Sequence, residues 1–264
     1  MSRARYPSDL TDRAWARLQP LLSPERPGGR HRSVDEREIV NGILYLTHNG
    51  CTWRALLHDL PPWETVYAYL RRWEDDGTWE QALAVLRRAV RQQAGRDPEP
   101  RAGSIDSQRV RTTEAGGPRG YEAGKKVSGR KRPSIVDTLG LLLAVVVTAA
   151  NLSDAAGAKQ VLSRAWDWAP RLQLLWADQT SGGTVVEWTK AVYGWTLSIV
   201  AKLADQHTFV VLPRRWVVER SFAWLCRCRR LSKDYERLPT VSETFIQLAM
   251  IHLLLHRVAR YDTS

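Results

Sequence analysis

Hydrophobic residues recur with a helical period through the first third of the chain. Helices are predicted at about 8–22, from a Ser33/Glu36 capping box to Gly50, at about 52–58, from Trp63 to about Asp75, and from a Thr78/Gln81 cap to about Ala94. The Pro61-Pro62 turn makes the middle pair similar to a helix-turn-helix, although a plain helical bundle fits the same pattern. In a DNA-binding pair, the second helix would expose Glu64, Tyr67, Arg71 and Arg72.

The pattern changes after residues 97–102, which are typical of a linker. Strands are predicted at Ser104–Asp106, on both sides of a turn at 137–140, at Leu172–Ala177 and at 196–200, with an extended piece at 209–212. Helices are predicted at about 155–168, at about 183–193, and at about 241–258 after a Thr240/Glu243 capping box. The last helix is apolar on most sides and should be buried. This order predicts an α/β domain over 103–264, preceded by an all-α region over 1–96.

One further helix follows Pro213 and carries Glu219 among arginines. At about 100° per residue, its apolar residues share one face and Glu219 falls on the other. The apolar residues are Val217, Val218, Phe222, Leu225 and Cys228. The simplest interpretation of Glu219 is a helix salt bridge with Arg215 at i,i+4.

The charge of the chain favours a polyanionic partner. The net charge is +11, with 39 basic and 28 acidic side chains. Most of the excess follows the linker, in the half that carries Glu219. Residues 109–132 are rich in Gly and basic side chains, which predicts a solvated loop whose amides and lysines can lie against phosphates. Nucleic acid is therefore the expected partner, rather than a membrane.

The three cysteines form neither a disulfide framework nor a pair of zinc knuckles. A reducing, cytoplasmic setting fits this composition best. The first ten residues do not resemble a signal peptide, and the longest apolar run, 139–150, is too short to span a bilayer.

Two predicted strands end on acids, Asp106 and Asp178. In open α/β sheets, ligands bind at the carboxyl ends of the strands, and a helix packed there could add Glu219. Three converging carboxylates require neutralising charge. Two Mg²⁺ ions (or Mn²⁺) would supply it and would suit phosphoryl transfer.

Other acids and histidines have structural interpretations. Asp137 fits a turn, and Asp154 fits a helix cap. Asp234 and Glu236 are expected to pair with the preceding arginines. His252 and His256 have a zinc-like i,i+4 spacing, but without an HExxH motif they are interpreted as residues of the last helix.

The chain resembles the bacterial insertion-sequence transposases that have an RNase H-like DDE catalytic domain. The resemblance covers nearly the whole chain. It rests on YPSDLTDRAWARLQPLL, GCTWRALLHDLPPWETVY, RRWEDDGTWE, SIDSQ, AGKKVSGRKR, VDTLGLLL, WAD and FVVLPRRWVVERSFAWL with RRLSKDYE.

This resemblance implies an RNase H-like sheet and a metal-binding triad of Asp106, Asp178 and Glu219. It implies a transposase that binds the terminal inverted repeats of its element, cleaves DNA with Mg²⁺, and joins the ends to target DNA as a homo-oligomer. Phosphate contacts are expected from Arg215, Arg220, Arg227, Arg230, Lys233, Lys125, Lys126, Arg130, Lys131, Arg71 and Arg72.

The chain departs from the family pattern near the triad. Leu212 replaces a common tyrosine, Cys226 a common lysine, and Pro133-Ser134 a common histidine; residues 179–183 differ from the usual Gly-rich segment. One alternative is therefore a decayed copy that binds DNA without cutting it. Another is an RNase H-like nuclease for RNA–DNA hybrids, which leaves the helical region without a role.

Overall fold

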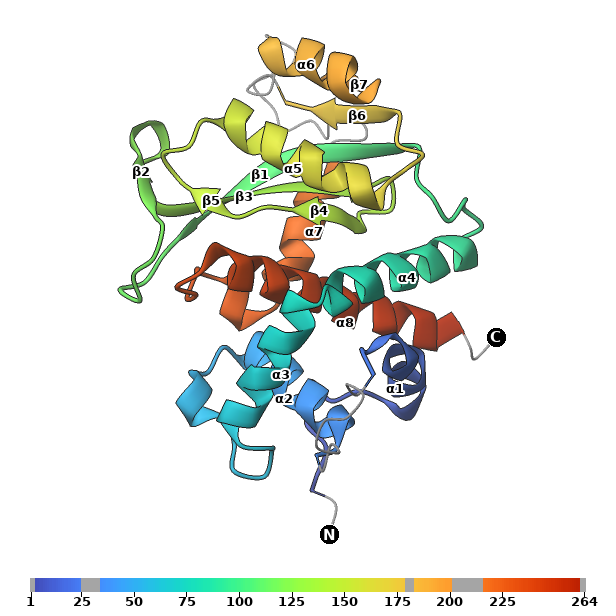
Figure 1. Ribbon diagram of the computed structural model, residues 1–264, viewed down its shortest axis with the longest axis vertical. Coiled ribbons are helices and arrows are strands. Elements are labelled where there is room, and N and C mark those ends of the chain that lie inside the picture. The colour runs from blue at the N-terminus through green and yellow to red at the C-terminus, as the bar shows by residue number, and fades with distance from the viewer. Residues whose placement is uncertain (1–2, 25–33, 179–182, 201–215, 262–264) are drawn as a thin grey trace.

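The computed structural model describes residues 3–24, 34–178, 183–200 and 216–261. Helices form one end of the molecule and a mixed sheet with its covering helices forms the other (Figure 1). The predicted extended piece at 209–212 lies outside the described residues, as do Ser33, Leu212, Pro213 and Arg215.

The N-terminal region is helical, as predicted. Its elements are α1 (Asp12–Leu18), η1 (Gln19–Leu21), α2 (Glu36–Asn49), η2 (Trp53–Ala55), α3 (Trp63–Asp75) and α4 (Thr78–Gln93). The predicted helix at 52–58 is only the single 3₁₀ turn η2. Pro61 and Pro62 separate this turn from α3. The predicted helix-turn-helix-like pair therefore contains only one full helix, α3.

The structure corrects two predicted helix starts. The N-cap of α2 is Asp35, whose carboxylate accepts a hydrogen bond from the Arg37 amide at 2.8 Å. The N-cap of α4 is Gly77, because the Thr78 hydroxyl is already bonded to Asp76. Several short polar side chains near a helix start can accept its first amide hydrogen bonds, so the sequence pattern does not fix the N-cap residue. The predicted N-caps therefore differ from the observed ones by one or two residues.

The sheet has the strand order β2–β3–β1–β6–β7, and β4 and β5 also pair with β3. The strands are β1 (Ala102–Arg111), β2 (Gly120–Glu122), β3 (Val127–Asp137), β4 (Leu142–Val145), β5 (Thr148–Ala149), β6 (Leu174–Ala177) and β7 (Thr196–Ile199). β1 runs antiparallel to β3 and parallel to β6. This is the mixed sheet of the RNase H-like fold, as predicted.

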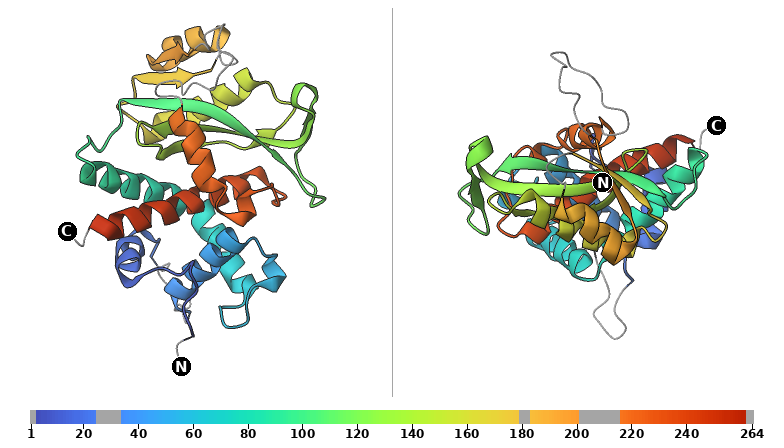
Figure 2. Two further views of the ribbon diagram at one scale, coloured as in Figure 1. Left: turned by 180° about the vertical axis from the view of Figure 1, so that it is seen from behind. Right: turned by 90° about the horizontal axis from the view of Figure 1, so that it is seen from above.

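Helices cover both faces of this sheet. On one face lies α5 (Asp154–Trp168), with α6 (Thr184–Tyr193) beside it; on the other face α7 (Trp216–Leu225) crosses the strands (Figures 1 and 2). Ile105 and Ile135 pack with Val161 and Leu162 of α5 in one buried cluster. Val136, the next residue of β3, instead joins the core on the α7 side, as the two-residue period of a strand requires.

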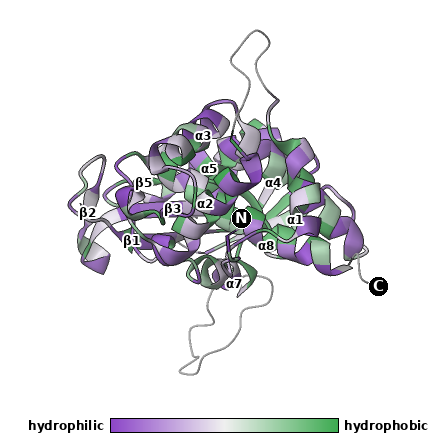
Figure 3. Cartoon of the chain, turned by 90° about the horizontal axis from the view of Figure 1, so that it is seen from below, coloured by the Kyte–Doolittle hydropathy of each residue, from purple (hydrophilic) through white to green (hydrophobic). Residues whose placement is uncertain are grey.

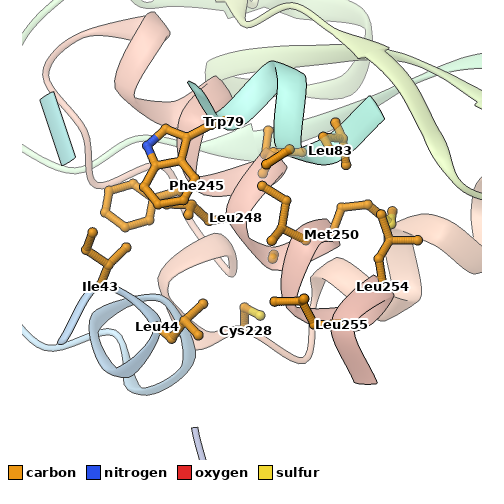
Figure 4. Close-up of a cluster of buried hydrophobic side chains, with 14 of the residues drawn as sticks. Ile43, Leu44, Trp79, Leu83, Cys228, Phe245, Leu248, Met250, Leu254 and Leu255 are labelled. Atoms are coloured by element: carbon orange, nitrogen blue, oxygen red, sulfur yellow. The ribbon is translucent and has the colours of Figure 1, made fainter. Parts of the chain in front are cut away.

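The last helix, α8 (Pro239–Tyr261), is buried as predicted and joins the two ends of the molecule. Its Phe245, Met250 and Leu254 share a core with Trp79 and Leu83 of α4 (Figure 4). Hydrophobic residues lie near the centre of the molecule and polar residues along its periphery (Figure 3). The predicted Thr240/Glu243 capping box is wrong, because Glu243 accepts a hydrogen bond from the Val147 amide instead.

The structure also corrects the loop predicted at 109–132. This segment continues β1, forms β2 and begins β3, and Asp106 lies within β1 rather than at its end. The strand pattern was hidden because several inward-facing positions carry cations, which are buried only because distant acids neutralise them. Within the described part of the chain, no helix is both long and apolar enough to cross a bilayer.

Candidate active site

Two acids lie just beyond the parallel pairing of β1 and β6. The last paired residues are Ser104 and Trp176, and Asp106 and Asp178 follow them by two residues on their respective strands. Both acids are half-buried. β1 continues past this point with Asp106 opposite Ser134 of β3, so the predicted strand end is in fact the end of the parallel pairing.

Both aspartates belong to the same face of the sheet. Ile105 and Ala177, their immediate neighbours, lie in the hydrophobic cluster on the α5 side. Because successive residues of a strand point to opposite faces, Asp106 belongs to the face that α7 crosses. Asp178 directly follows Ala177, the last residue of β6, so a continued alternation places it on the same face. The register and the strand period thus bring these two acids to one edge and one face.

α7 is fixed on that face by hydrogen bonds to the β3–β4 turn and to β1. The Ser221 hydroxyl donates to the carbonyl of Gly140 at 2.7 Å, and the Arg220 guanidinium donates to the carbonyl of Leu139 at 3.0 Å. The Gln108 amide donates to the Cys226 sulfur at 3.4 Å. α7 therefore has a defined position next to the strand that carries Asp106.

Glu219 lies on the outer side of α7. Val217 and Val218 are buried while Glu219 is exposed, which confirms that the glutamate falls away from the apolar face. Its predicted partner Arg215 lies outside the described residues. The side chain of Glu219 therefore sits at the surface of the same face as the two aspartates.

The turn that receives α7 is organised by Asp137. One carboxylate oxygen accepts hydrogen bonds from the amides of Leu139 and Leu141, at 2.8 and 2.9 Å. The other oxygen pairs with Arg91 of α4. The structural interpretation of Asp137 is therefore confirmed.

Carboxylate oxygens are the ligands that Mg²⁺ favours, so the chemistry of Asp106, Asp178 and Glu219 suits this ion. Yet within the described residues, no group of three Asp, Glu, His or Cys side chains is placed to share one ion. The fold aligns the three acids on one face without gathering them around a single point.

Two arginines expected to contact DNA are structural instead. Arg130 is fully buried, pairs with Asp234 at 3.0 Å and donates to the carbonyl of Arg237. Arg230 pairs with Glu236 at 2.8 Å and lies 4.4 Å from the centre of the Phe245 ring. A buried cation with such partners is held inside the fold, so neither reaches a phosphate.

Lys131 is also buried, with Asp154 at 2.9 Å and the Leu152 carbonyl at 2.8 Å. Asp154 lies in the first turn of α5, whose N-cap is Ser153. The cap predicted at Asp154 is thus displaced by one residue, and the predicted DNA contact of Lys131 is replaced by an internal ion pair.

The other cations differ in how accessible they are. Arg220 is half-buried, with its guanidinium over the rings of Trp216 and Trp224 at 4.4 and 4.8 Å. Burial lowers its pKa from the ordinary arginine value. The exposed cations of the expected set are Lys125, Lys126, Arg227 and Lys233.

The exposure expected for α3 is correct for two of its four side chains. Glu64 and Tyr67 are exposed. Arg71 pairs with Glu74 at 2.6 Å and Asp75 at 3.2 Å, and its side chain is 28% exposed. Arg72 is likewise half-buried and donates to the carbonyl of Pro24. Arg71 lies along the surface of α3 because it forms ion pairs at i,i+3 and i,i+4 within that helix.

The family "Transposase DDE domain" matches residues 97–254, which include all three acids of the expected triad. The chain belongs to this family. Residues 10–83 match a second family, "Putative transposase of IS4/5 family". The N-terminal helices and the sheet are thus both parts of transposase families.

Two individual proteins are similar to this chain. The "Uncharacterized protein y4sN" of Sinorhizobium fredii is 28% identical over 79 residues, which are 30% of this chain and 63% of that protein. The chain thus spans less than two thirds of that relative. The "Crystal structure of the Mos1 Strand Transfer Complex" is 12% identical and aligns over 91% of this chain and 81% of that chain, with a TM-score of 0.34.

Proposed function

We propose that the protein is a DNA transposase that binds the ends of its insertion element, cleaves the DNA there and transfers the ends to a target. The observation that carries this proposal is the placement of Asp106 and Asp178 beyond the parallel β1–β6 pairing, on the face crossed by the helix of Glu219. Membership of the DDE-domain family supports the same assignment.

In this proposal, Asp106 and Asp178 hold two Mg²⁺ (or Mn²⁺) ions and Glu219 completes the site. Bound ions of this kind activate an attacking oxygen and stabilise the leaving oxygen in phosphoryl transfer. The protein itself positions DNA through exposed cations, among them Arg227, just after α7, and Lys233, just after η5 (Arg229–Leu231). Hydrolysis at the element end frees a 3′-OH, which then attacks target DNA.

The helical region, residues 1–96, binds the element ends in this scheme, and residues 103–264 carry out the chemistry. The exposed Glu64 and Tyr67 of α3 are available to a DNA groove. Because two ends must be held together, the active form is a homo-oligomer on DNA.

The test uses the purified full chain, Mg²⁺ and a supercoiled plasmid that carries this gene with its flanking DNA. Asp106→Asn should lower the cleavage rate by more than about a hundredfold, because it removes a carboxylate from the metal site. Asp167→Asn, at an exposed acid on α5, is the matched control and should cleave like the parent. Equal cleavage by the parent and Asp106→Asn would reject the site.

A second candidate is a DNA-binding copy that no longer cuts. The observation that favours it is Cys226, which contacts Gln108 at a position where the family pattern has a lysine. This candidate predicts a shifted DNA band in a gel without Mg²⁺-dependent cleavage. Nicked or linear plasmid that forms with Mg²⁺ but not in the presence of EDTA would exclude this second candidate.

A further inference from the structure

The connection from β1 through β2 into β3 projects beyond the body of the sheet (Figure 1). We call residues 111–127 the β2 arm. Tyr121, in β2, is 58% exposed, the largest exposed fraction among the large hydrophobic residues that the structure describes. Lys125 and Lys126, just after it, are exposed as well. An exposed aromatic ring beside two cations suits a contact to duplex DNA, because cations pair with phosphates and an apolar side chain can lie against sugars and base edges.

On the α5 side, ion pairs fix the base of the β2 arm. Arg109 pairs with Glu122 at 2.5 Å and with Asp154 at 3.0 Å. Lys131 pairs with Asp154 at 2.9 Å. Glu122 is the residue next to Tyr121, so these pairs hold β2 from one side and leave Tyr121 on the other.

On the α7 side, the segment around Asp234 fixes the arm. The Asp234 amide donates to the carbonyl of Arg111 at 2.8 Å, and the Thr113 amide donates to the carbonyl of Asp234 at 3.3 Å. Arg130 bridges the Pro118 carbonyl and the Asp234 carboxylate, at 2.7 and 3.0 Å. The arm is therefore ordered before any ligand binds, which lowers the entropy lost on binding.

Strand register places Tyr121 relative to the acids. Tyr121 is opposite Ser128 of β3, and Asp106 is opposite Ser134 of the same strand. Residues that lie directly opposite each other in an antiparallel pair have side chains on the same face of the sheet. Within one strand, residues separated by an even number also share a face, as Ser128 and Ser134 do. Tyr121 and Asp106 therefore both lie on the α7 face. Six residues of strand span about 20 Å, or about six base pairs at about 3.4 Å each.

We propose that Tyr121 contacts the sugar–base surface of a DNA duplex about six base pairs from the bound scissile phosphate, while Lys125 and Lys126 pair with flanking phosphates. The inference rests on the proposed transposase function and adds to it a second, non-catalytic contact point. The sequence pattern indicated the two lysines but not the tyrosine.

The test measures DNA binding without cleavage. The full chain is titrated in EDTA against a fluorescein-labelled duplex of about 30 base pairs, followed by anisotropy over a KCl series. Tyr121→Ser should weaken binding about tenfold with an unchanged salt slope, because it removes an apolar ring contact and no charge, whereas Tyr121→Phe keeps the ring and should bind like the parent. The double variant Lys125→Gln/Lys126→Gln should reduce the salt slope by about two.

Matched controls come from α6, on the α5 side of the sheet. Val192→Ser replaces an apolar residue that is 51% exposed, and Lys190→Gln removes an exposed cation; both should bind like the parent. Thermal unfolding verifies that each variant is folded. The proposal is overturned when a folded Tyr121→Ser binds like the parent, when Tyr121→Phe loses as much as Tyr121→Ser, or when the lysine variant keeps the parent's salt slope.

The plasmid cleavage assay separates this proposal from the proposed function. If the parent cleaves DNA with Mg²⁺ and Tyr121→Ser binds the duplex as tightly as the parent, the transposase function is supported and the arm contact is rejected. Weakened binding by Tyr121→Ser in a protein that does not cleave supports the arm contact and rejects catalysis. A parent that does not bind the duplex rejects both.

Discussion

Arg91 and Asp137 form a buried ion pair, 2.5 Å between Nη1 and Oδ2, that joins α4 to the turn on which α7 rests. Their side chains are 5% and 0% exposed. The Arg91 Nε also donates to the carbonyl of Asp97, just after α4. One ion pair thus links the N-terminal helices, the chain that leads into β1, and the support of the helix of Glu219.

Replacing Arg91 by Met should lower the free energy of unfolding by about 3–5 kcal/mol, because the Asp137 carboxylate would remain buried without its partner. Urea denaturation of the purified chain measures this loss. Arg88→Met is the matched control: Arg88 lies on the same helix as Arg91 and pairs with Glu99, but its side chain is 41% exposed. Its loss should be below about 1 kcal/mol, and similar losses for the two variants would contradict the role given to the buried pair.

Gly140 should not tolerate a side chain. Its φ is +80°, and a Cβ would lie 2.8 Å from the Ser221 hydroxyl and 3.1 Å from the Trp224 ring. Gly140→Ala should therefore cost about 1–2 kcal/mol of backbone strain and also displace α7, which lowers DNA cleavage. Gly194→Ala, at the end of α6, is the control, because its φ is +70° but nothing lies within 4 Å of its Cβ. It should lose stability without losing specific activity; equal activity of the two variants would argue against the contact.

His252 should destabilise the fold in acid. Burial lowers the pKa of His252 from 6.5 to about 3, with His256 and His48 adding to the shift. The unfolded chain binds a proton at this residue near pH 6.5 while the folded chain does not, so the contribution of His252 to stability is full above that pH and is lost as the pH falls towards 3. Glu243 acts in the opposite direction, because burial raises its pKa from 4.5 to about 7.

Between pH 6.5 and pH 5 the loss due to His252 should reach about 2 kcal/mol, measured by urea denaturation as the difference between the pH profiles of the parent and His252→Asn. His58→Asn, at an exposed histidine, is the control and should keep the parent's profile. An unaltered acid profile in His252→Asn would assign the pH dependence to other groups.

Cys226 is exposed and follows the last turn of α7. Because the family pattern has a lysine there, Cys226→Lys should strengthen binding to a DNA duplex and raise the salt slope by about one. Cys226→Ser, which adds no charge, is the control. A rise in Mg²⁺-dependent cleavage in the lysine variant alone would show that the natural cysteine limits the reaction, and an unchanged salt slope would place residue 226 away from the phosphates.

Much of the fold follows from local patterns. The helix α3 begins at Trp63 and ends at Asp75 as predicted, and β6 ends directly before Asp178. The α8 prediction was correct in burial, but it was two residues short at the N-terminal end and three residues short at the C-terminal end. Each of these elements has a period that its own residues display, so no distant contact was needed to recognise it.

The strands around residue 130 could not be predicted in the same way. Arg130 and Lys131 were predicted to lie in a solvated loop, because burying a cation without a partner costs free energy. Their partners, Asp234 and Asp154, are remote in sequence, and the pairing becomes visible only when β3 is in place. Arg130 and Lys131, both expected to contact DNA, are internal for this reason, as is Arg230 through its pair with Glu236. Because these strands were predicted as a loop, Tyr121 was not recognised as an outward-facing strand residue.

The sequence by itself determined most of the helices, the strand before Asp178 and which three acids belong to the transposase pattern, because hydrophobic period and motif residues are local properties of the chain. The tertiary structure decided that Asp106 and Asp178 share one face beyond the β1–β6 pairing, and which cations face solvent. Those properties depend on strand register and on ion pairs between distant residues, such as Arg130 with Asp234, and neither is encoded in a local pattern.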